Sequence, residues 1–257
     1  MALVYSAPNL TELYLVVGHN WGHTNNLFLN KRAKGRISTP KFTLPFLTTV
    51  VVDYSGPGGY PACFIPSLDG LLHSAPNLTT LRLNCRYKGG QVTASLPQLT
   101  TLDLCRTSVS TRNLRKLVRH SARLVEFRLT HWGSRGRRRG MPPVSPQQAL
   151  HALAPARLTL RRLTLHTWMP EDDWWGLKAG ERFPLLDGVR LADLFPALEQ
   201  LSLDVRAVAG LPDLLAGLEL LEELTLVKAK ASHYWEIATF IQRVRVCEWQ
   251  RLRRVKM

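Results

Sequence analysis

Histidines and glycines that suggest metal or phosphate chemistry stand in unsuitable surroundings. His19 and His23 are four residues apart, as two zinc ligands on one helix would be, but the neighbouring glycines predict a loop. No glutamate follows them in the pattern of a zinc protease. The glycine-rich segment at residues 56–59 lacks the strand, lysine and helix that a phosphate-binding loop requires. We therefore expect no metal site and no nucleotide site in these segments.

The candidates for nucleophilic or redox chemistry are equally sparse. The sequence contains no GxSxG nucleophile elbow, and no cysteine stands in a recognisable catalytic pattern with histidine. Four cysteines are too far apart for CxxC chemistry and too few for a disulfide scaffold, namely Cys63, Cys85, Cys105 and Cys247. We expect no catalytic residues and no cofactor, and thus a protein that is not an enzyme.

Leucine dominates the elements that must position any functional side chain. The 257 residues include 45 leucines but only 4 isoleucines, a skew that indicates a repeated structural position. The segment SAPNLTEL from Ser6 returns almost unchanged as SAPNLTTL from Ser74. The pattern Lxx[LVF]x[LV] recurs eight times, starting at Leu10, Leu47, Leu78, Leu99, Leu124, Leu160, Leu198 and Leu221. Strict LxxLxL occurs seven times, in six of these units and once out of frame from Leu215, whereas chance predicts about one match.

The alternation within each unit predicts a strand with one buried face. The fourth and sixth positions are apolar and alternate with polar residues, while the first position enters the core from the preceding turn. Of the 24 positions of this kind, 21 hold leucine, and the exceptions are Val50, Val52 and Phe127. One such strand cannot bury its leucines alone, so the units must stack as parallel strands around a continuous core.

Helices are expected between the strands. Ser110 is placed to cap a helix that carries Leu114, Leu117 and Val118 at helical spacing. Ser145 followed by Pro146 is a typical start of a second helix. Residues 211–221 predict a third helical stretch before the last strand.

These repeats resemble the leucine-rich repeat family of the ribonuclease-inhibitor-like type. The resemblance implies an α/β fold: an irregular solenoid with a parallel sheet on the concave side and helices on the convex side. Irregularity is expected because unit starts are separated by 21 to 38 residues and the asparagine or cysteine of the family's ninth position is missing. The predicted organisation is a solenoid of about eight units over residues 1–230, followed by a C-terminal cap over residues 231–257.

Long, uneven units preceded by HSAPNL or LFPAL look like the repeat regions of fungal F-box proteins. The resemblance implies a protein-protein interaction scaffold that recognises substrates for an F-box type ubiquitin ligase. No F-box is visible in the sequence, so a ligase adaptor is an expected partner only if that module is missing from this chain. With no signal-peptide pattern and no apolar run near 20 residues, we expect a cytoplasmic or nuclear protein without a membrane partner.

A mixed group of charged and aromatic side chains is the candidate partner-binding site. The third, fifth and seventh positions of each unit are expected to face solvent from the concave side. In the middle of this surface these positions and its rim hold Arg82, Asp103, Glu126, Arg128, Arg162, Trp132 and Trp168. Arginine and tryptophan are favoured interface residues, which points to a target protein. The alternative is that neighbouring strands pair these charges and that the tryptophan rings cover the edge of the core.

The uneven charge of the chain suggests a second function class. Residues 1–168 hold 22 basic and 5 acidic residues, whereas the following segment, residues 169–242, holds 6 and 13. Two basic loops are expected, at residues 31–36 and 134–146, the second of which contains Arg135, Arg137, Arg138 and Arg139. These arginines fit a nuclear-import signal or a nucleic-acid contact, and also a solvated loop without a partner. Nucleic-acid or other polyanion binding is therefore the alternative function.

Overall fold

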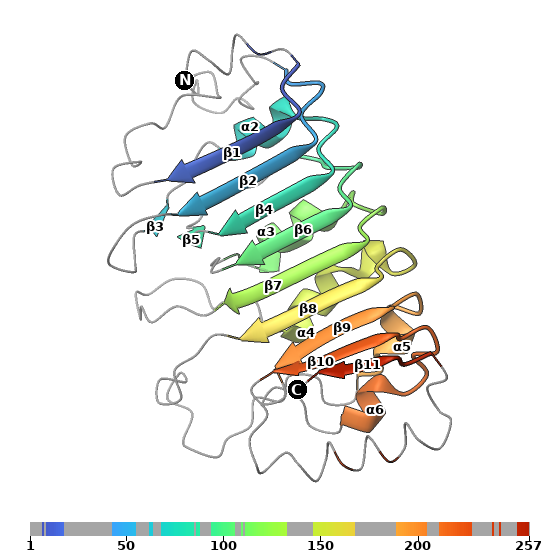
Figure 1. Cartoon of the computed structure of the whole chain (residues 1–257). Helices are drawn as coiled ribbons and strands as arrows, with labels where there is room; N and C mark the ends of the chain where they lie inside the picture. Colours follow the sequence, from blue (N-terminus) through green and yellow to red (C-terminus); the bar gives the residue numbers. More distant parts are fainter. Residues whose placement is uncertain are drawn as a thin grey trace.

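The repeated units form the parallel strands of one sheet in a computed structural model of the chain (Figure 1). The structure describes residues 7, 9–17, 43–54, 62–63, 68–84, 86–87, 94–105, 109, 111–132, 146–167, 189–204, 211–227, 238, 242 and 251–256. The main sheet has nine strands in the order β1-β2-β4-β6-β7-β8-β9-β10-β11. The predicted α/β class and the parallel sheet are confirmed.

The strands follow the leucine pattern closely. Their bounds are β1 (Glu12–Val17), β2 (Thr49–Tyr54), β4 (Thr80–Asn84), β6 (Thr101–Cys105), β7 (Glu126–Trp132), β8 (Arg162–Thr167), β9 (Gln200–Asp204), β10 (Glu223–Val227) and β11 (Arg254–Lys256). Each of the first eight begins at the third position of its unit. Equivalent positions pair across the sheet, so that Leu13 lies opposite Val50 and Val50 opposite Leu81. The repeat therefore fixes the register as well as the strands.

One face of the sheet packs against helices. These are α2 (Leu68–Ser74), α3 (Thr111–Val118), α4 (Pro146–Ala152), α5 (Leu191–Leu194) and α6 (Leu211–Leu215), with a short 3₁₀ helix at Ala154–Ala156. In Figure 1, α2, α3 and α4 lie behind the sheet, and α5 and α6 lie near the end of the sheet that holds β10 and β11. Of the 24 apolar repeat positions, all except Leu10 and Leu15 are buried in this layer, and Phe127 is fully enclosed. A second, two-stranded sheet pairs β3 (Ala62–Cys63) with β5 (Arg86–Tyr87).

The helices agree with the sequence in two places and differ in one. Helix α3 buries Leu114, Leu117 and Val118 as predicted, and α4 begins at Pro146. The third stretch ends at Leu215, well short of the predicted residue 221. The cause is Gly217, which has φ of 80°, a left-handed conformation that ends helices and that residues with a Cβ rarely adopt.

A tight turn containing proline precedes four of the strands in the main sheet. In the unit before β2, the backbone N–H of Leu47 donates to the carbonyl of Leu44, with Pro45 at the second place of the turn. The same bond recurs before β4, β6 and β9, where the second residues are Pro76, Pro97 and Pro196. Proline suits this place because its fixed φ matches a turn. These turns place the first leucine of each unit against the core.

The second position of each unit links consecutive units. The carbonyl of Thr11 accepts the backbone N–H groups of Thr48 and Thr49, and the corresponding carbonyls are used in the same way along the sheet. In the first units the side chains join in: the hydroxyls of Thr48, Thr79 and Thr100 each donate to the second-position carbonyl of the preceding unit, at 3.1 Å. We call these three contacts the threonine ladder.

A ninth strand extends the sheet beyond the eight predicted units. β11 pairs in parallel with β10, and Leu252 packs against the core just before it. The letters LRRVKM from Leu252 fit the same spacing, with valine and methionine in place of leucine. Most of residues 231–250, which belong to the predicted C-terminal cap, lie outside the described residues.

Candidate functional site

The sheet face opposite the helices presents the outward positions of the repeat. We call this surface the open face. It is formed by the third, fifth and seventh positions of the eight repeat units in the main sheet and by Arg254 and Lys256 of β11. Most of its side chains alternate with buried ones, as in the half-buried, buried, exposed, buried, half-buried sequence of β4. Glu126 and Asp204 are themselves buried. The fifth-position row runs across the sheet as Tyr14, Val51, Arg82, Asp103, Arg128, Thr164, Ser202, Thr225 and Lys256.

Five of the predicted site residues lie together at the centre of the open face. Glu126 is at their base and forms two ion pairs: its Oε1 lies 2.5 Å from Arg128 Nε and its Oε2 lies 3.0 Å from Arg162 Nη2. The Glu126 side chain is 11% exposed, whereas those of Arg128 and Arg162 are 51% and 45% exposed. The carboxylate therefore lies beneath two guanidinium side chains that are themselves about half exposed. We call Arg82, Asp103, Glu126, Arg128 and Arg162 the central charge cluster.

Asp103 completes the cluster between two arginines. The register places it beside Arg82 of β4 and Arg128 of β7 in the fifth-position row. Burial raises the pKa of the Asp103 carboxyl above its usual value, although the positive charges of Arg128 and Arg82 act in the opposite direction. Glu126 adds to the rise. The pairing of charges that the sequence left open as an alternative thus exists, and it leaves the arginines outermost.

An apolar patch at the N-terminal end of the open face was not predicted as part of the site. Tyr14 and Val16 of β1 are 64% and 65% exposed, and Val51 of β2 beside them is half-buried. The sequence does contain evidence for this patch, because these apolar residues occupy positions of the repeat that are expected to face solvent. We call Tyr14, Val16 and Val51 the apolar patch.

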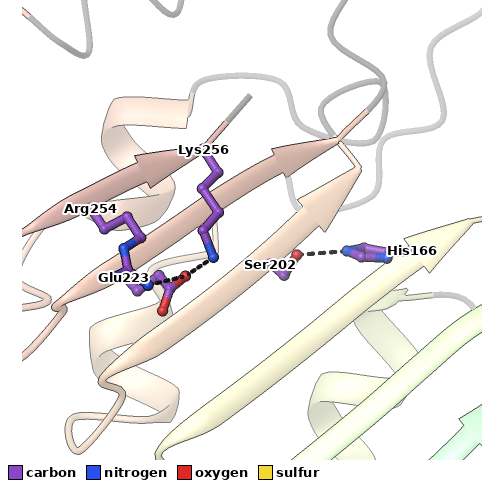
Figure 2. Close-up of polar contacts among 5 residues, drawn as sticks. All are labelled: His166, Ser202, Glu223, Arg254 and Lys256. Carbon is purple, nitrogen blue, oxygen red and sulfur yellow. Dashed lines mark hydrogen bonds and ion pairs between the residues drawn. The ribbon is translucent and has the colours of Figure 1, made fainter.

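The C-terminal end of the open face gains two cations from β11. Lys256 Nζ donates to Glu223 Oε1 at 2.5 Å, and Arg254 Nη1 lies 3.7 Å from the same oxygen (Figure 2). The hydrogen bond from Lys256 and the two positive charges lower the pKa of the Glu223 carboxyl. Both basic residues stand in the repeat pattern of the ninth strand, which is the signal that would have identified them.

A serine and a histidine meet between these two ends. His166 of β8 and Ser202 of β9 share a hydrogen bond of 2.7 Å between Nε2 and Oγ (Figure 2). Serine bonded to imidazole resembles one part of a nucleophilic site, but acyl transfer also requires donors for an oxyanion. β8 and β9 are adjacent in the sheet, where residues 162–165 pair with residues 200–203. The contact therefore links neighbouring strands across the open face.

The remaining predicted site residues fall outside the described part of the chain or at its limit. The backbone of Trp132 ends β7, with a register shift between Thr130 and Trp132, but its side chain is not among those described. Trp168 and the loop arginines Arg135, Arg137, Arg138 and Arg139 lie outside the described residues. Five of the site residues predicted from the sequence therefore lie on one surface in the structure.

The described residues contain no group of three or more metal-ligating side chains placed to hold an ion. They also contain no helix long and apolar enough to cross a membrane. What the described geometry offers is a surface with an apolar patch at one end, arginines at the centre and paired cations at the other end. No protein-family model, curated protein or solved structure matched the chain.

Proposed function

We propose that the chain is a non-enzymatic interaction scaffold of the leucine-rich repeat type and that its open face binds a target protein. The observation that carries the proposal is the arrangement of the central charge cluster. Two half-exposed arginines stand over a buried carboxylate that holds them in place. Fixed guanidinium groups lose little freedom on binding and suit a protein interface.

The solenoid architecture is part of the same proposal. Consecutive units lie side by side in chain order, equivalent residues pair, and helices cover one face among the described elements. Repeat proteins of this kind present extended binding surfaces because each unit contributes equivalent outward positions. A role in substrate recognition for an F-box type ubiquitin ligase is the finer form of the proposal, and it derives from the resemblance of the repeats.

Affinity capture from cell extract with three forms of the full chain tests the proposal. The open-face variant is Arg82→Ala/Arg128→Ala, and the matched control is Arg112→Ala/Arg115→Ala, which removes the same charge from exposed positions of α3. We expect wild type and control to capture the same proteins and the open-face variant to lose them. If all three capture the same set, the open face is not the binding surface. Absence of ligase adaptor subunits from the wild-type capture would contradict only the ligase role.

Polyanion binding is the second candidate, supported by the 22 basic and 5 acidic residues of the first 168. Salt concentration separates the two functions. Binding that depends on neutralised phosphates falls by about 10³-fold or more between 50 and 200 mM salt when six or more phosphates are contacted. A protein interface with an apolar part is expected to change far less over this range. A steep salt dependence of the captured complex would favour the polyanion function.

A further inference from the structure

The open face exposes its charges unequally. Arg82 is exposed and Arg128 and Arg162 are about half exposed, whereas Glu126 is buried and Asp103 is half-buried. A molecule approaching the centre of the sheet therefore meets guanidinium donors first. An incoming carboxylate gains charge-assisted hydrogen bonds there, and an incoming cation is repelled.

Three exposed side chains that could contact a partner are evenly spaced along the fifth-position row. Tyr14, Arg82 and Arg128 stand on β1, β4 and β7, which are the first, third and fifth strands of the sheet. Neighbouring strands lie about 4.8 Å apart, so consecutive members of this series are separated by about 9.6 Å. The intervening positions hold Val51, which extends the apolar patch, and Asp103, which repels an anion.

This spacing matches one extended peptide conformation. A polyproline II helix has three residues per turn and a rise of about 3.1 Å, so side chains three residues apart point the same way at about 9.3 Å. A β-strand places residues of one face about 6.6 Å or 13 Å apart, which fits the series less well. A nucleic-acid strand carries one charge per about 3.4 Å of helix axis and would place phosphates over Asp103.

We propose that the open face binds an acidic protein segment in the polyproline II conformation, with an apolar residue followed by carboxylates three and six residues later. The apolar side chain packs on Tyr14, Val16 and Val51, and the carboxylates accept hydrogen bonds from Arg82 and Arg128. A neutral residue lies over Asp103. This inference rests on the proposed function and specifies the class of target sequence.

Fluorescence anisotropy with short labelled peptides tests the spacing. The probe is acetyl-Leu-Pro-Pro-Glu-Pro-Pro-Glu-Pro-amide carrying a fluorophore, and its matched control has the same composition with the two glutamates adjacent. We expect wild type to bind the probe at least fivefold more tightly than the control. Arg82→Ala/Arg128→Ala should weaken binding about tenfold or more, and Tyr14→Ala severalfold, whereas Arg112→Ala/Arg115→Ala should leave it unchanged.

Three results overturn the inference. In the first, the probe and the control peptide bind equally well. In the second, the probe shows no measurable binding at about 1 mM, and in the third, an oligouridylate competes for the same arginines and binds more tightly than the probe. The capture experiment distinguishes this failure from failure of the proposed function. If Arg82→Ala/Arg128→Ala still loses the captured proteins, the open face binds a target of another sequence class. If it retains them, the proposed function itself is wrong.

Discussion

The two halves of the sheet connect their units by different side chains at the same position. The residue just before each of β1, β2, β4 and β6, at the second position of its unit, is threonine. The hydroxyls of Thr48, Thr79 and Thr100 donate to the second-position carbonyl of the preceding unit. From β7 to β10 this position holds Val125, Arg161, Glu199 and Glu222, and Arg161 forms an ion pair with Glu199. The backbone bonds to the second-position carbonyl are nevertheless the same in both halves.

The difference shows which interactions define the fold. Because the backbone ladder and the buried leucines persist across the whole sheet, the side chain at the second position adapts to its surroundings. The halves meet where β6 pairs with β7, and Leu102 lies opposite the fully buried Phe127. One apolar core extends through this junction. The halves are therefore expected to unfold together despite their different surface contacts.

Phe127→Ala should have the largest effect, because it removes a buried ring at the junction of the halves. We expect a loss of about 3–5 kcal/mol in the free energy of unfolding, in a single transition because both halves share the core. Urea titrations followed by circular dichroism and by tryptophan fluorescence measure it. Leu158→Ala, at a leucine that is 74% exposed, is the control and should leave the midpoint nearly unchanged. Two separated transitions would mean that the halves are independent.

The leucine pattern was sufficient to predict the strands and their register. Each unit encodes its own strand through local alternation, so no knowledge of distant contacts was needed. β11 escaped because Met257 stands at the sixth position, where the pattern has leucine or valine. The early end of α6 depends on a left-handed Gly217, and nothing in the periodicity of that stretch marks this conformation.

The contacts of the candidate site were less predictable than its location. The outward positions followed from the period of two, which identified Arg82, Asp103 and Arg128 as neighbours on adjacent strands. The burial of each side chain could not be predicted from the same period. Glu126 lies beneath Arg162 because of packing between two strands, and these residues are 36 positions apart in the sequence. The apolar patch was overlooked because Tyr14 and Val16 continue an apolar run that suits a core strand equally well.

Thr79→Val tests the threonine ladder with an intermediate effect. The change keeps the shape of the side chain and removes the hydroxyl that donates to the carbonyl of Thr48, so we expect a loss of about 1 kcal/mol. The loss should not depend on salt. Thr80→Val, at the neighbouring residue outside this ladder, is the matched control. Urea titrations at low and high salt measure both variants, and equal losses in the two would contradict a specific role for the ladder.

The smallest expected effects concern pH, and their signs differ between the halves. Asp103 in the first half has a raised folded pKa, so its charge opposes folding above that pKa and the cost disappears as the pH falls through it. Glu223 in the second half has a lowered folded pKa, so its contribution is present above the unfolded value and is lost as the pH falls through the folded one.

Asp103→Asn should therefore raise the melting temperature at neutral pH, and Glu223→Gln should lower it, each by about 1–2 °C. The Asp103→Asn curve should approach wild type from above as the pH falls, because the wild-type carboxyl becomes neutral. The Glu223→Gln curve should approach it from below, since acid also removes the attraction of Glu223 for Lys256 and Arg254. Melting curves at pH values from about 7 down to the acid limit of stability measure both. A lowered melting temperature of Asp103→Asn at neutral pH would show that the attraction of Arg128 and Arg82 outweighs the effect of burial at Asp103. A raised melting temperature of Glu223→Gln would contradict the stabilising role of Glu223.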